Sequence, residues 1–499
     1  MSEIVETTHG RVRGIARDGH VAYLGLRYAQ PPIGARRFAA PVAPEPWDGV
    51  QDAHAFGLSC PQPPSVLPGM EAGPQGEDCL FLNVYASRGG GSRKPVLVWL
   101  HGGGFSAGSG AQAIYDGGAL AARGDAVVVT VNYRLGPLGF LHLPALGADV
   151  PGAVDNPGVL DQLAALAWVR DNAAAFGGDP GNVTIFGESA GGMSVTTLLA
   201  CPASRGIVRR AIAQSGAAQA TLDREGAART AHAVLEELGL SVSEAARLRD
   251  VPVEQLVQAG QRVSLRLTGE LFLAFAPLVD GDVLPAHPLD AIRAGAARDV
   301  ALMTGTTADE WRLFTFASPQ HRQMDEAALV KRIERRLARL GRGDDTMALI
   351  DLYRRAREGA PPWHIFDAIE TDRMFRIPAI QLAEAQRALQ PATFMYVFAW
   401  PSPAAGGLLG ACHAIELPFV FGTLGAPHME RFSGGGPVAE RLSQQVMDAW
   451  LAFARDGVPA ASGVGPWPAY DLERRATMIL DAESRVIDDP ARDEREAWA

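Results

Sequence analysis

The chain has 499 residues, of which 47% are hydrophobic and 20% charged, and its formal net charge at pH 7 is −11. This composition fits a globular protein with a large core, and the absence of a Lys/Arg-rich block excludes nucleic acid and anionic membranes as expected partners. No apolar run reaches membrane-spanning length. Residues 1–6 are acidic and lack the pattern of a secretory signal, so we expect a cytoplasmic protein.

The cysteine pattern gives no indication of a metal site. The chain has four cysteines, Cys60, Cys79, Cys201 and Cys412, and none of them forms a C-x-x-C pair. We therefore expect neither a metal nor a cofactor. In a cytoplasmic protein the thiols should be reduced, although Cys60 and Cys79, which flank a Pro/Gly-rich loop, could form a disulfide in an oxidising compartment.

The first third of the chain reads as strands joined by irregular segments. Residues 10–14 and 21–25 alternate in the manner of antiparallel strands. The Pro-rich residues 30–34 cannot form a helix, and residues 60–79 are expected to be a loop. Residues 80–85 are apolar and indicate the next strand.

The middle of the chain alternates buried-type strands with helices. Continuous apolar runs, typical of strands covered on both faces, occupy residues 95–100, 126–133 and 182–186. Residues 158–172 have helical spacing, and residues 209–216 read as another strand and turn. This alternation predicts an α/β fold with a mostly parallel sheet and helices on both faces.

The second half contains further elements but no repeat and no long linker. In chain order, we expect helices over 222–262, a short strand over 275–281, a buried strand over 300–305, charged amphipathic helices over 323–358, a strand over 392–399 and a helix over 441–455. One large domain over 1–499 fits this order. The helices of 222–262 and 323–358 are then insertions around the entrance to the site.

The strongest chemical signal is the stretch around Ser189. An apolar run over 183–186 ends in Gly187, Ser189 follows, and a helix-like run begins after Gly191. This is the G-x-S-x-G nucleophile elbow in its required strand-turn-helix context. The sharp turn exposes the hydroxyl, and the helix N-terminus offers N–H groups to a developing oxyanion. A structural turn is the weaker alternative, so Ser189 is the predicted nucleophile.

A serine nucleophile needs a base and an acid, which in this fold follow it in the order acid, then histidine. Of the histidines after Ser189, His413 is the best candidate because it follows the last strong strand in a loop of small residues. Asp309 and Glu310 both follow the strand ending near Gly305. Sequence spacing alone does not separate these two carboxylates.

A Gly-rich loop completes the predicted site. His101-Gly102-Gly103-Gly104-Phe105 directly follows a buried strand. It matches the loop that builds an oxyanion hole together with the residue after the nucleophile. Consecutive glycines can turn their N–H groups toward one point, although a flexible turn is the alternative.

These motifs together resemble the type-B carboxylesterases, the carboxylesterase/cholinesterase group of the α/β-hydrolase fold, and most of all the bacterial p-nitrobenzyl-esterase-like members. The resemblance runs nearly from end to end of the chain. It rests on residues 30–34, 77–80, 102–105, 132–134, 161–162, 186–192, 309–310 and 410–421. Several ordered motifs over this length make it specific.

The resemblance implies a role for each of a set of residues. The nucleophile, acid and base are Ser189, Glu310 and His413, and the oxyanion donors are the N–H groups of Gly103, Gly104 and Ala190. The substrate pocket is placed at Phe105, Leu271, Leu273, Trp311 and Phe314. Arg37 with Glu77, and Arg134 with Asp161, are implied to be buried structural ion pairs.

The chain also departs from the family. Trp311 replaces the glycine that usually follows the acid, and no tryptophan lies between Cys60 and Cys79, where cholinesterases hold choline. We therefore expect a monomeric serine carboxylesterase for small esters with short to medium acyl chains, including aromatic ones, and not for choline esters. A carbamate or amide hydrolase with the same triad is one alternative. A non-catalytic cholinesterase-like binding module is another, which the retained triad residue types disfavour.

Overall fold

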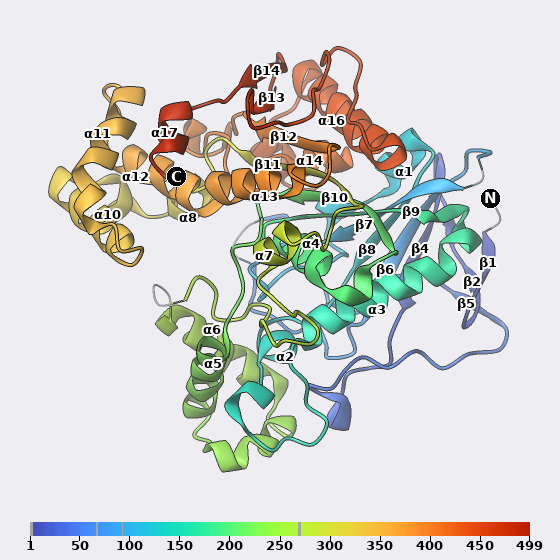
Figure 1. Ribbon diagram of the computed structural model, residues 1–499. Helices are drawn as coiled ribbons and strands as arrows, with labels where there is room; N and C mark the ends of the chain where they lie inside the picture. The colour runs from blue at the N-terminus through green and yellow to red at the C-terminus, as the bar shows by residue number, and fades with distance from the viewer. Residues whose placement is uncertain (1–2, 66–67, 92, 268–270) are drawn as a thin grey trace.

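A large mixed sheet forms the centre of the structure, a computed structural model that describes residues 3–65, 68–91, 93–267 and 271–499 (Figure 1). The strands are β1 (Ile4–Thr7), β2 (Gly10–Arg13), β3 (Ile15–Ala16), β4 (His20–Arg27), β5 (Val50–Asp52), β6 (Phe81–Ser87), β7 (Lys94–Leu100), β8 (Val127–Val131), β9 (Gly178–Glu188), β10 (Val208–Gln214), β11 (Ala301–Thr307), β12 (Thr393–Phe398), β13 (Ala476–Leu480) and β14 (Arg485–Asp488). The large sheet has the order β14-β13-β12-β11-β10-β9-β7-β8-β6-β4-β3, and β1, β2 and β5 form a separate small sheet.

The centre of the large sheet is parallel and its edges are antiparallel. The strands from β8 through β7, β9, β10, β11 and β12 to β13 pair in parallel. At the two edges, β14 and the group β6, β4 and β3 pair antiparallel. The expected α/β fold with a mostly parallel sheet is confirmed. The parallel strands end at one common edge, which is where such folds place their sites.

Helices cover both faces of the sheet. They are α1 (Gly118–Gly124), α2 (Gly136–Phe140), α3 (Pro157–Asn172), α4 (Ala190–Ala200), α5 (Arg224–Glu237), α6 (Val253–Leu267), α7 (Pro288–Arg293), α8 (Arg312–Thr315), α9 (Pro319–Arg322), α10 (Glu326–Ala338), α11 (Thr346–Ala356), α12 (Pro362–Thr371), α13 (Ile377–Arg387), α14 (Leu417–Phe421), α15 (Met429–Ser433), α16 (Pro437–Asp456) and α17 (Arg492–Glu496). A π-helical turn, η8 (Asp372–Arg376), joins α12 to α13.

The apolar residues of the central strands pack into two cores. All residues of β7 and β8 are buried, which explains why these strands read as continuous apolar runs. One core joins the sheet to α3 and α4, for example through Val159 and Leu198. The other joins it to α14 and α16, for example through Phe421 and Trp450.

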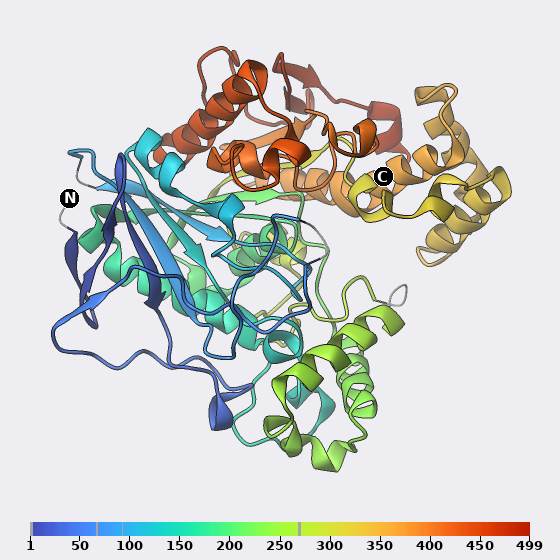
Figure 2. The same cartoon turned by 180° about the vertical axis from the view of Figure 1, so that it is seen from behind.

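Two helical arms stand on one side of the sheet. Figures 1 and 2 show α5 and α6 in one arm, and α10, α11 and α12 in the other. The second arm has its own apolar core, which includes Leu329, Ile350 and Ile365. The helices expected over 222–262 and 323–358 therefore exist. The prediction of a strand over 275–281 is wrong. Pro277 lacks an N–H, and this segment makes only an isolated bridge between Leu222 and Leu278.

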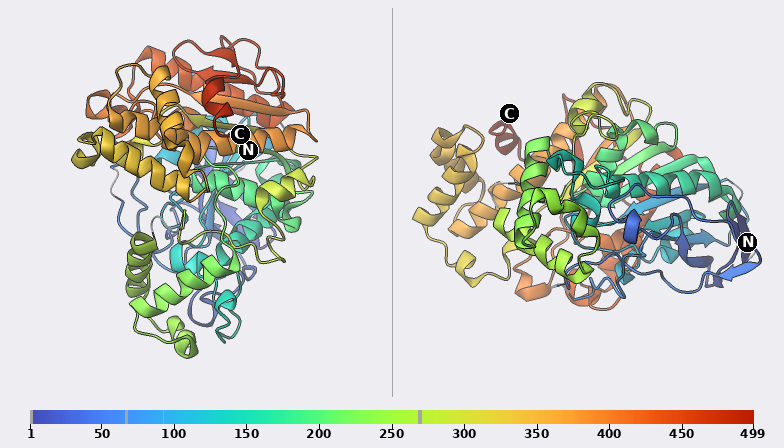
Figure 3. Two further views of the ribbon diagram at one scale, coloured as in Figure 1. Left: turned by 60° about the vertical axis from the view of Figure 1, so that its left-hand side comes forward. Right: turned by 90° about the horizontal axis from the view of Figure 1, so that it is seen from below.

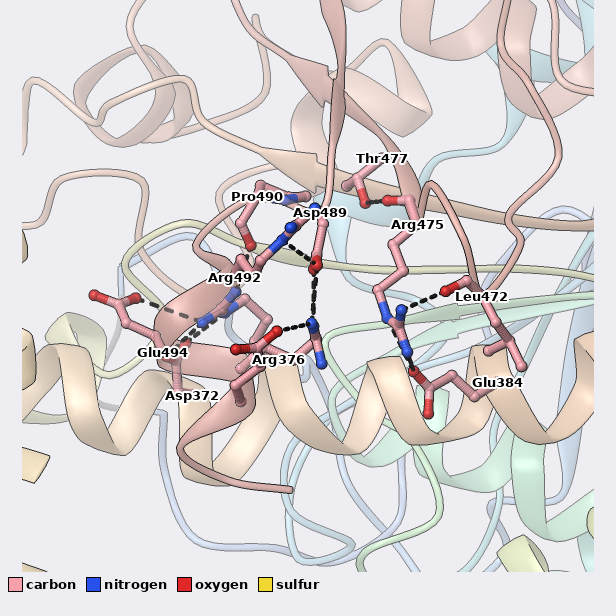
Figure 4. Close-up of polar contacts among 12 residues, drawn as sticks. Asp372, Arg376, Glu384, Leu472, Arg475, Thr477, Asp489, Pro490, Arg492 and Glu494 are labelled. Carbon is pink, nitrogen blue, oxygen red and sulfur yellow. Dashed lines mark hydrogen bonds and ion pairs between the residues drawn. The ribbon is translucent and has the colours of Figure 1, made fainter.

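The C-terminal segment packs against residues 359–391, for which no element was predicted from the sequence. Figure 4 shows Arg376 of η8 between Asp372 and the segment of Pro490 and Glu494, and Arg475 on Glu384 of α13. In Figure 3 (right), β1 and β2 lie at one end of the molecule and α17 near the other. No helix in the described ranges is long and apolar enough to cross a bilayer.

Two ion pairs lie where the resemblance implied them, and two early cysteines lie in the core without a disulfide. Arg134 is buried with Asp161 (Nη2 to Oδ1, 2.7 Å), and Arg37 pairs with Glu77 (Nε to Oε2, 2.6 Å). Both pairs are confirmed. Cys60 and Cys79 are buried and carry free thiols. The loop over 60–79 is irregular where described, and residues 66 and 67 within it lie outside the described residues.

Candidate active site

Ser189 lies at the carboxyl end of β9, in a backbone conformation that residues other than glycine rarely adopt. Its backbone has φ 57° and ψ −126°, and α4 begins at the next residue. Positive φ at a non-glycine residue costs free energy and is typical of functional turns. Gly191 allows the close approach, because a Cβ atom there would lie 2.0 Å from Leu100 O. The side chain of Ser189 is partly exposed, while its neighbours on both sides are buried.

His413 and Glu310 meet at the same edge of the sheet. Nδ1 of His413 lies 2.6 Å from Glu310 Oε2, and the His413 N–H donates to Glu310 O at 3.4 Å. Glu310 follows β11 and His413 follows β12, so two parallel strand ends bring them together. Their exposed fractions are 0% and 5%. A carboxylate at Nδ1 favours a ring that carries a proton on Nδ1.

Asp309 points elsewhere. Its carboxylate pairs with Arg312 at 3.0 Å and accepts the N–H of Ala411 at 3.0 Å. The structure therefore separates the two carboxylates that the sequence did not. Glu310 contacts the histidine, and Asp309 connects its own loop to the loop that carries His413.

Glu188 is a site residue that the sequence reasoning missed. Its Oε1 lies 3.0 Å from His413 Nε2, on the side of the ring opposite Glu310. Glu188 is 3% exposed and stands immediately before Ser189. The available signal was its place as the first variable residue of the G-x-S-x-G motif, where a carboxylate is costly to bury without a partner.

The charges around His413 alter its acid–base behaviour. Burial opposes the charged imidazolium, but Glu188 and Glu310 outweigh burial and hold the pKa of His413 well above its usual value. Burial also raises the pKa of Glu188, against the attraction of His413. A third buried carboxyl, Glu416, has its pKa raised to about 8 by burial and by Glu188 and Glu310. Gln214 donates to Glu416 at 3.1 Å.

The Gly-rich loop lies beside the elbow. Gly103 and Gly104 have φ of 109° and 60°, conformations open mainly to glycine. In the described part of the chain, the N–H groups of Gly103, Gly104 and Ala190 donate to no other residue. The loop approaches the nucleophile directly, since a Cβ atom on Gly102 would lie 3.1 Å from Ser189 Cβ.

A neutral histidine supports this loop from beneath. His101 is 1% exposed, and its ring stacks on Tyr133 with centroids 4.4 Å apart. Burial lowers the pKa of His101 to about 4, despite its hydrogen bond to Gly102 O. Tyr133 Oη donates to His101 O at 2.7 Å. The Gly-rich loop thus packs on the uncharged His101 ring, which is held by Tyr133.

The residues expected in the substrate pocket occupy three different places. Phe314 lies next to His413, with ring centroids 5.1 Å apart, and Trp311 packs on Phe314. Leu271 and Leu273 are partly buried, and Leu273 Cδ2 would lie 3.7 Å from a Cβ atom on Gly104. Phe105 is fully buried against Phe140, so it supports the loop and presents no accessible surface.

An apolar cavity of about 360 Å³ lies beside the segments that follow Glu310 and His413 in the chain, although neither of these two residues lines it. Leu313 and Phe316 follow Glu310 in the chain and line it, as does Ala414, the neighbour of His413. Met70 contributes from the loop between Cys60 and Cys79. Among the described residues, no group of His, Cys, Asp and Glu side chains is arranged to hold a metal ion.

Comparison with known proteins gives consistent matches over the whole chain. The model of the Carboxylesterase family matches residues 1–498. A para-nitrobenzyl esterase of Bacillus subtilis is 42% identical over 501 residues, spanning 99% of this chain and 98% of the relative. A phenmedipham hydrolase of Pseudarthrobacter oxydans is 36% identical, spanning 97% and 96%. Among solved structures, a thermophilic PNB esterase (40% identity) and a carboxylesterase of Geobacillus stearothermophilus (39%) each superpose with a TM-score of 0.88 over 100% of both chains.

Proposed function

The chain belongs to the carboxylesterase family and is a carboxylic-ester hydrolase, and on this basis we propose that it acts through Ser189, His413 and Glu310 as nucleophile, base and acid. The observation that carries the proposal is the 2.6 Å contact between His413 and Glu310 at the strand edge where the Ser189 elbow ends. The alternative of a non-catalytic binding module is rejected, because the matches over the whole chain are to carboxylesterases. No observation favours a carbamate or amide substrate over an ester.

The reaction follows from the roles of these groups. Ser189 Oγ attacks the ester carbonyl while His413 Nε2 accepts its proton, and Glu310 stabilises the resulting imidazolium. The N–H groups of Gly103, Gly104 and Ala190 donate to the tetrahedral oxyanion. His413 then protonates the leaving alcohol, and water hydrolyses the acyl-enzyme by the same route.

Glu188 gives this scheme a resting state. With Nε2 of His413 next to Glu188, the imidazole is held between two carboxylates and is stabilised in its protonated form. To act as a base, His413 has to lose the proton on Nε2, so that Nε2 can accept the proton of the Ser189 hydroxyl. Glu188 opposes this loss, because its charge stabilises the protonated ring.

The substrate class is proposed from the walls around His413. Phe314 and Trp311 present aromatic surface beside His413, and the cavity bounded by Leu313 and Met70 is lined mainly by apolar side chains. These walls favour small esters with short to medium acyl chains, including aromatic esters. Choline esters lack the stacking tryptophan that would supply cation–π attraction.

The organisation of the chain is part of the same proposal. We regard residues 1–499 as one domain in which the helices of 222–262 and 323–358 are insertions beside the entrance. The four buried, unbridged cysteines fit a reducing compartment, which supports a location in the cytoplasm. That the protein is a monomer stays a prediction.

The proposal is tested first at the nucleophile. Ser189→Ala should lower kcat for p-nitrophenyl acetate by at least about 10³-fold, because only binding and the oxyanion hole remain. Ser215→Ala is the matched control: Ser215 also follows a strand and has φ 46°, but it is fully buried. Retention of more than about a tenth of kcat in Ser189→Ala would reject the assignment.

A further inference from the structure

One wall of the site is formed by a π-helical turn whose geometry is unusual. In η8, the N–H of Ile377 bonds to Asp372 O five residues earlier, so this turn holds one residue more than an α-helical turn. The turn carries Phe375, whose ring centroid lies 4.9 Å from that of His413. Phe375 is 3% exposed, and its ring is nearly parallel to that of Phe314, at an interplanar angle of 4°.

The turn is tied to both loops of the active site. Thr371, directly before it, accepts the N–H of Trp311 at 3.1 Å, next to the proposed acid Glu310. Gln219 donates to Met374 O at 3.0 Å and accepts the N–H of Ala217 at 2.8 Å, in the loop after β10. The Thr371 hydroxyl at the end of α12 and the Met374 carbonyl of η8 therefore join the loop after β11 to the loop after β10.

The outer side of the turn is held by a buried ionic cluster. Arg376 contacts Asp372 twice, both times at 2.6 Å, and is 8% exposed. Tyr353 of α11 donates its hydroxyl to the same carboxylate. Because the buried Arg376 guanidinium needs oppositely charged partners, its contacts with Asp372 fix the position of η8.

The C-terminal segment closes this cluster, as Figure 4 shows. Arg376 donates to Pro490 O at 3.0 Å and lies 3.5 Å from Glu494 Oε2. Glu494 of α17 also pairs with Arg357, and it is 4% exposed. A continuous set of contacts thus runs from the last helix of the chain through Arg376 and η8 to the ring on His413.

We propose that Arg376, held by Asp372 and by Glu494 of the C-terminal helix, is a positioning residue that fixes Phe375 against His413 and so sets the size of ester the site accepts. This rests on the proposed function of His413. A loosened η8 lets the Phe375 ring move away from the site, and the larger space favours bulky acyl groups over small ones. Arg376 itself touches no substrate and acts only through η8.

The test compares kcat/KM for p-nitrophenyl benzoate with that for p-nitrophenyl acetate. Phe375→Leu should raise the benzoate-to-acetate ratio by about tenfold, as expected for one ring removed from a pocket wall. Arg376→Met and Glu494→Gln should raise it in the same direction, by about threefold. Arg376→Lys, which keeps a cation facing Asp372, should recover part of the parent ratio. In the Phe375→Leu background, Arg376→Met should add little, since both act through one ring.

Figure 4 also supplies the matched control. Glu384→Gln breaks the pair with Arg475, which likewise joins the C-terminal segment to the helix after η8 but does not touch the π-turn. This variant should keep the parent ratio. The inference is overturned if folded Arg376→Met, or Glu494→Gln where Arg376→Met does not fold, leaves the ratio within about twofold of the parent. If the parent is active and the Arg376 and Glu494 variants keep its benzoate-to-acetate ratio, this inference alone is rejected. If Ser189→Ala is active, the proposed function is rejected.

Discussion

At the residue scale, the two neighbouring carboxylates after β11 give a direct prediction. Glu310→Gln should lower kcat by about 10³- to 10⁴-fold, because an amide cannot stabilise the imidazolium and holds the wrong tautomer. Asp309→Asn should lower kcat by less than about tenfold, since Asp309 contacts Arg312 and Ala411 and not the ring. Steady-state kinetics on one p-nitrophenyl ester decide between them. The opposite ranking would transfer the role of the acid to Asp309.

Glu188 predicts a change in pH dependence. Glu188 and Glu310 raise the pKa of His413 against the effect of burial, and the protonated ring cannot accept a proton from Ser189. Activity therefore falls as pH drops through this pKa. Glu188→Gln removes one of the two charges, so the acidic limb of kcat/KM should move to lower pH. A limb that stays in place, or moves to higher pH, would show that Glu188 does not control the titration of His413.

The site could be predicted from the sequence only as far as chain order and local motifs reach. Ser189 and the loop at Gly103 belong to motifs of consecutive residues, so they could be identified without knowledge of tertiary contacts. Phe375 lacks such a signal, and the place of Glu188 in the motif does not reveal its partner, because the contacts of both residues with His413 form only when the strand ends and η8 come together. Phe105 shows the same limit: its position in the motif is local, but its burial against Phe140 is tertiary.

At the element scale, the elbow depends on the close contact of α4 with the end of β7. A Cβ atom on Gly191 would lie 2.0 Å from Leu100 O, which is backbone and cannot move aside cheaply. Gly191→Ala should destabilise the protein by about 3 kcal/mol and abolish activity, because the helix must shift away from Ser189. Gly90→Ala, which has open space, should change stability by less than about 0.5 kcal/mol. Thermal unfolding and esterase assays of both variants measure this, and an active Gly191→Ala would contradict it.

Helices and strands could be predicted from the sequence where one spacing of apolar residues extended over the whole segment. The central strands are buried on both faces, so their apolar runs have a single interpretation, as in β7. The segment over 275–281 shows the failure: its apolar run and final Gly281 suggest a strand, yet no described strand lies beside it except for one bridge. The helices after residue 359 include η8, whose extra residue breaks the 3.6-residue period that would reveal them.

At the scale of the whole molecule, the question is whether a lid covers the site as it does in lipases. Such a lid needs an amphipathic helix that opens an apolar surface at an oil–water boundary. In the described part of the loop over 60–79 there is no helix, and its prolines explain why. In the second arm, α10 and α11 bury their apolar faces in the core of that arm. In its described residues, the α10–α12 arm therefore presents no free apolar face that could move as a lid.

This organisation predicts simple saturation kinetics on soluble esters. Among p-nitrophenyl esters graded by acyl length, kcat/KM should be highest for short acyl chains and fall for long ones, because the walls at Phe314 and Phe375 limit the space beside His413. The rate should show no jump when a substrate such as tributyrin exceeds its solubility, since no lid responds to the interface. Initial rates measured across the solubility limit, with a lipase as positive control, provide the measurement. A clear rise on emulsified long-chain triglyceride would contradict the open site and point to movement of the α10–α12 arm.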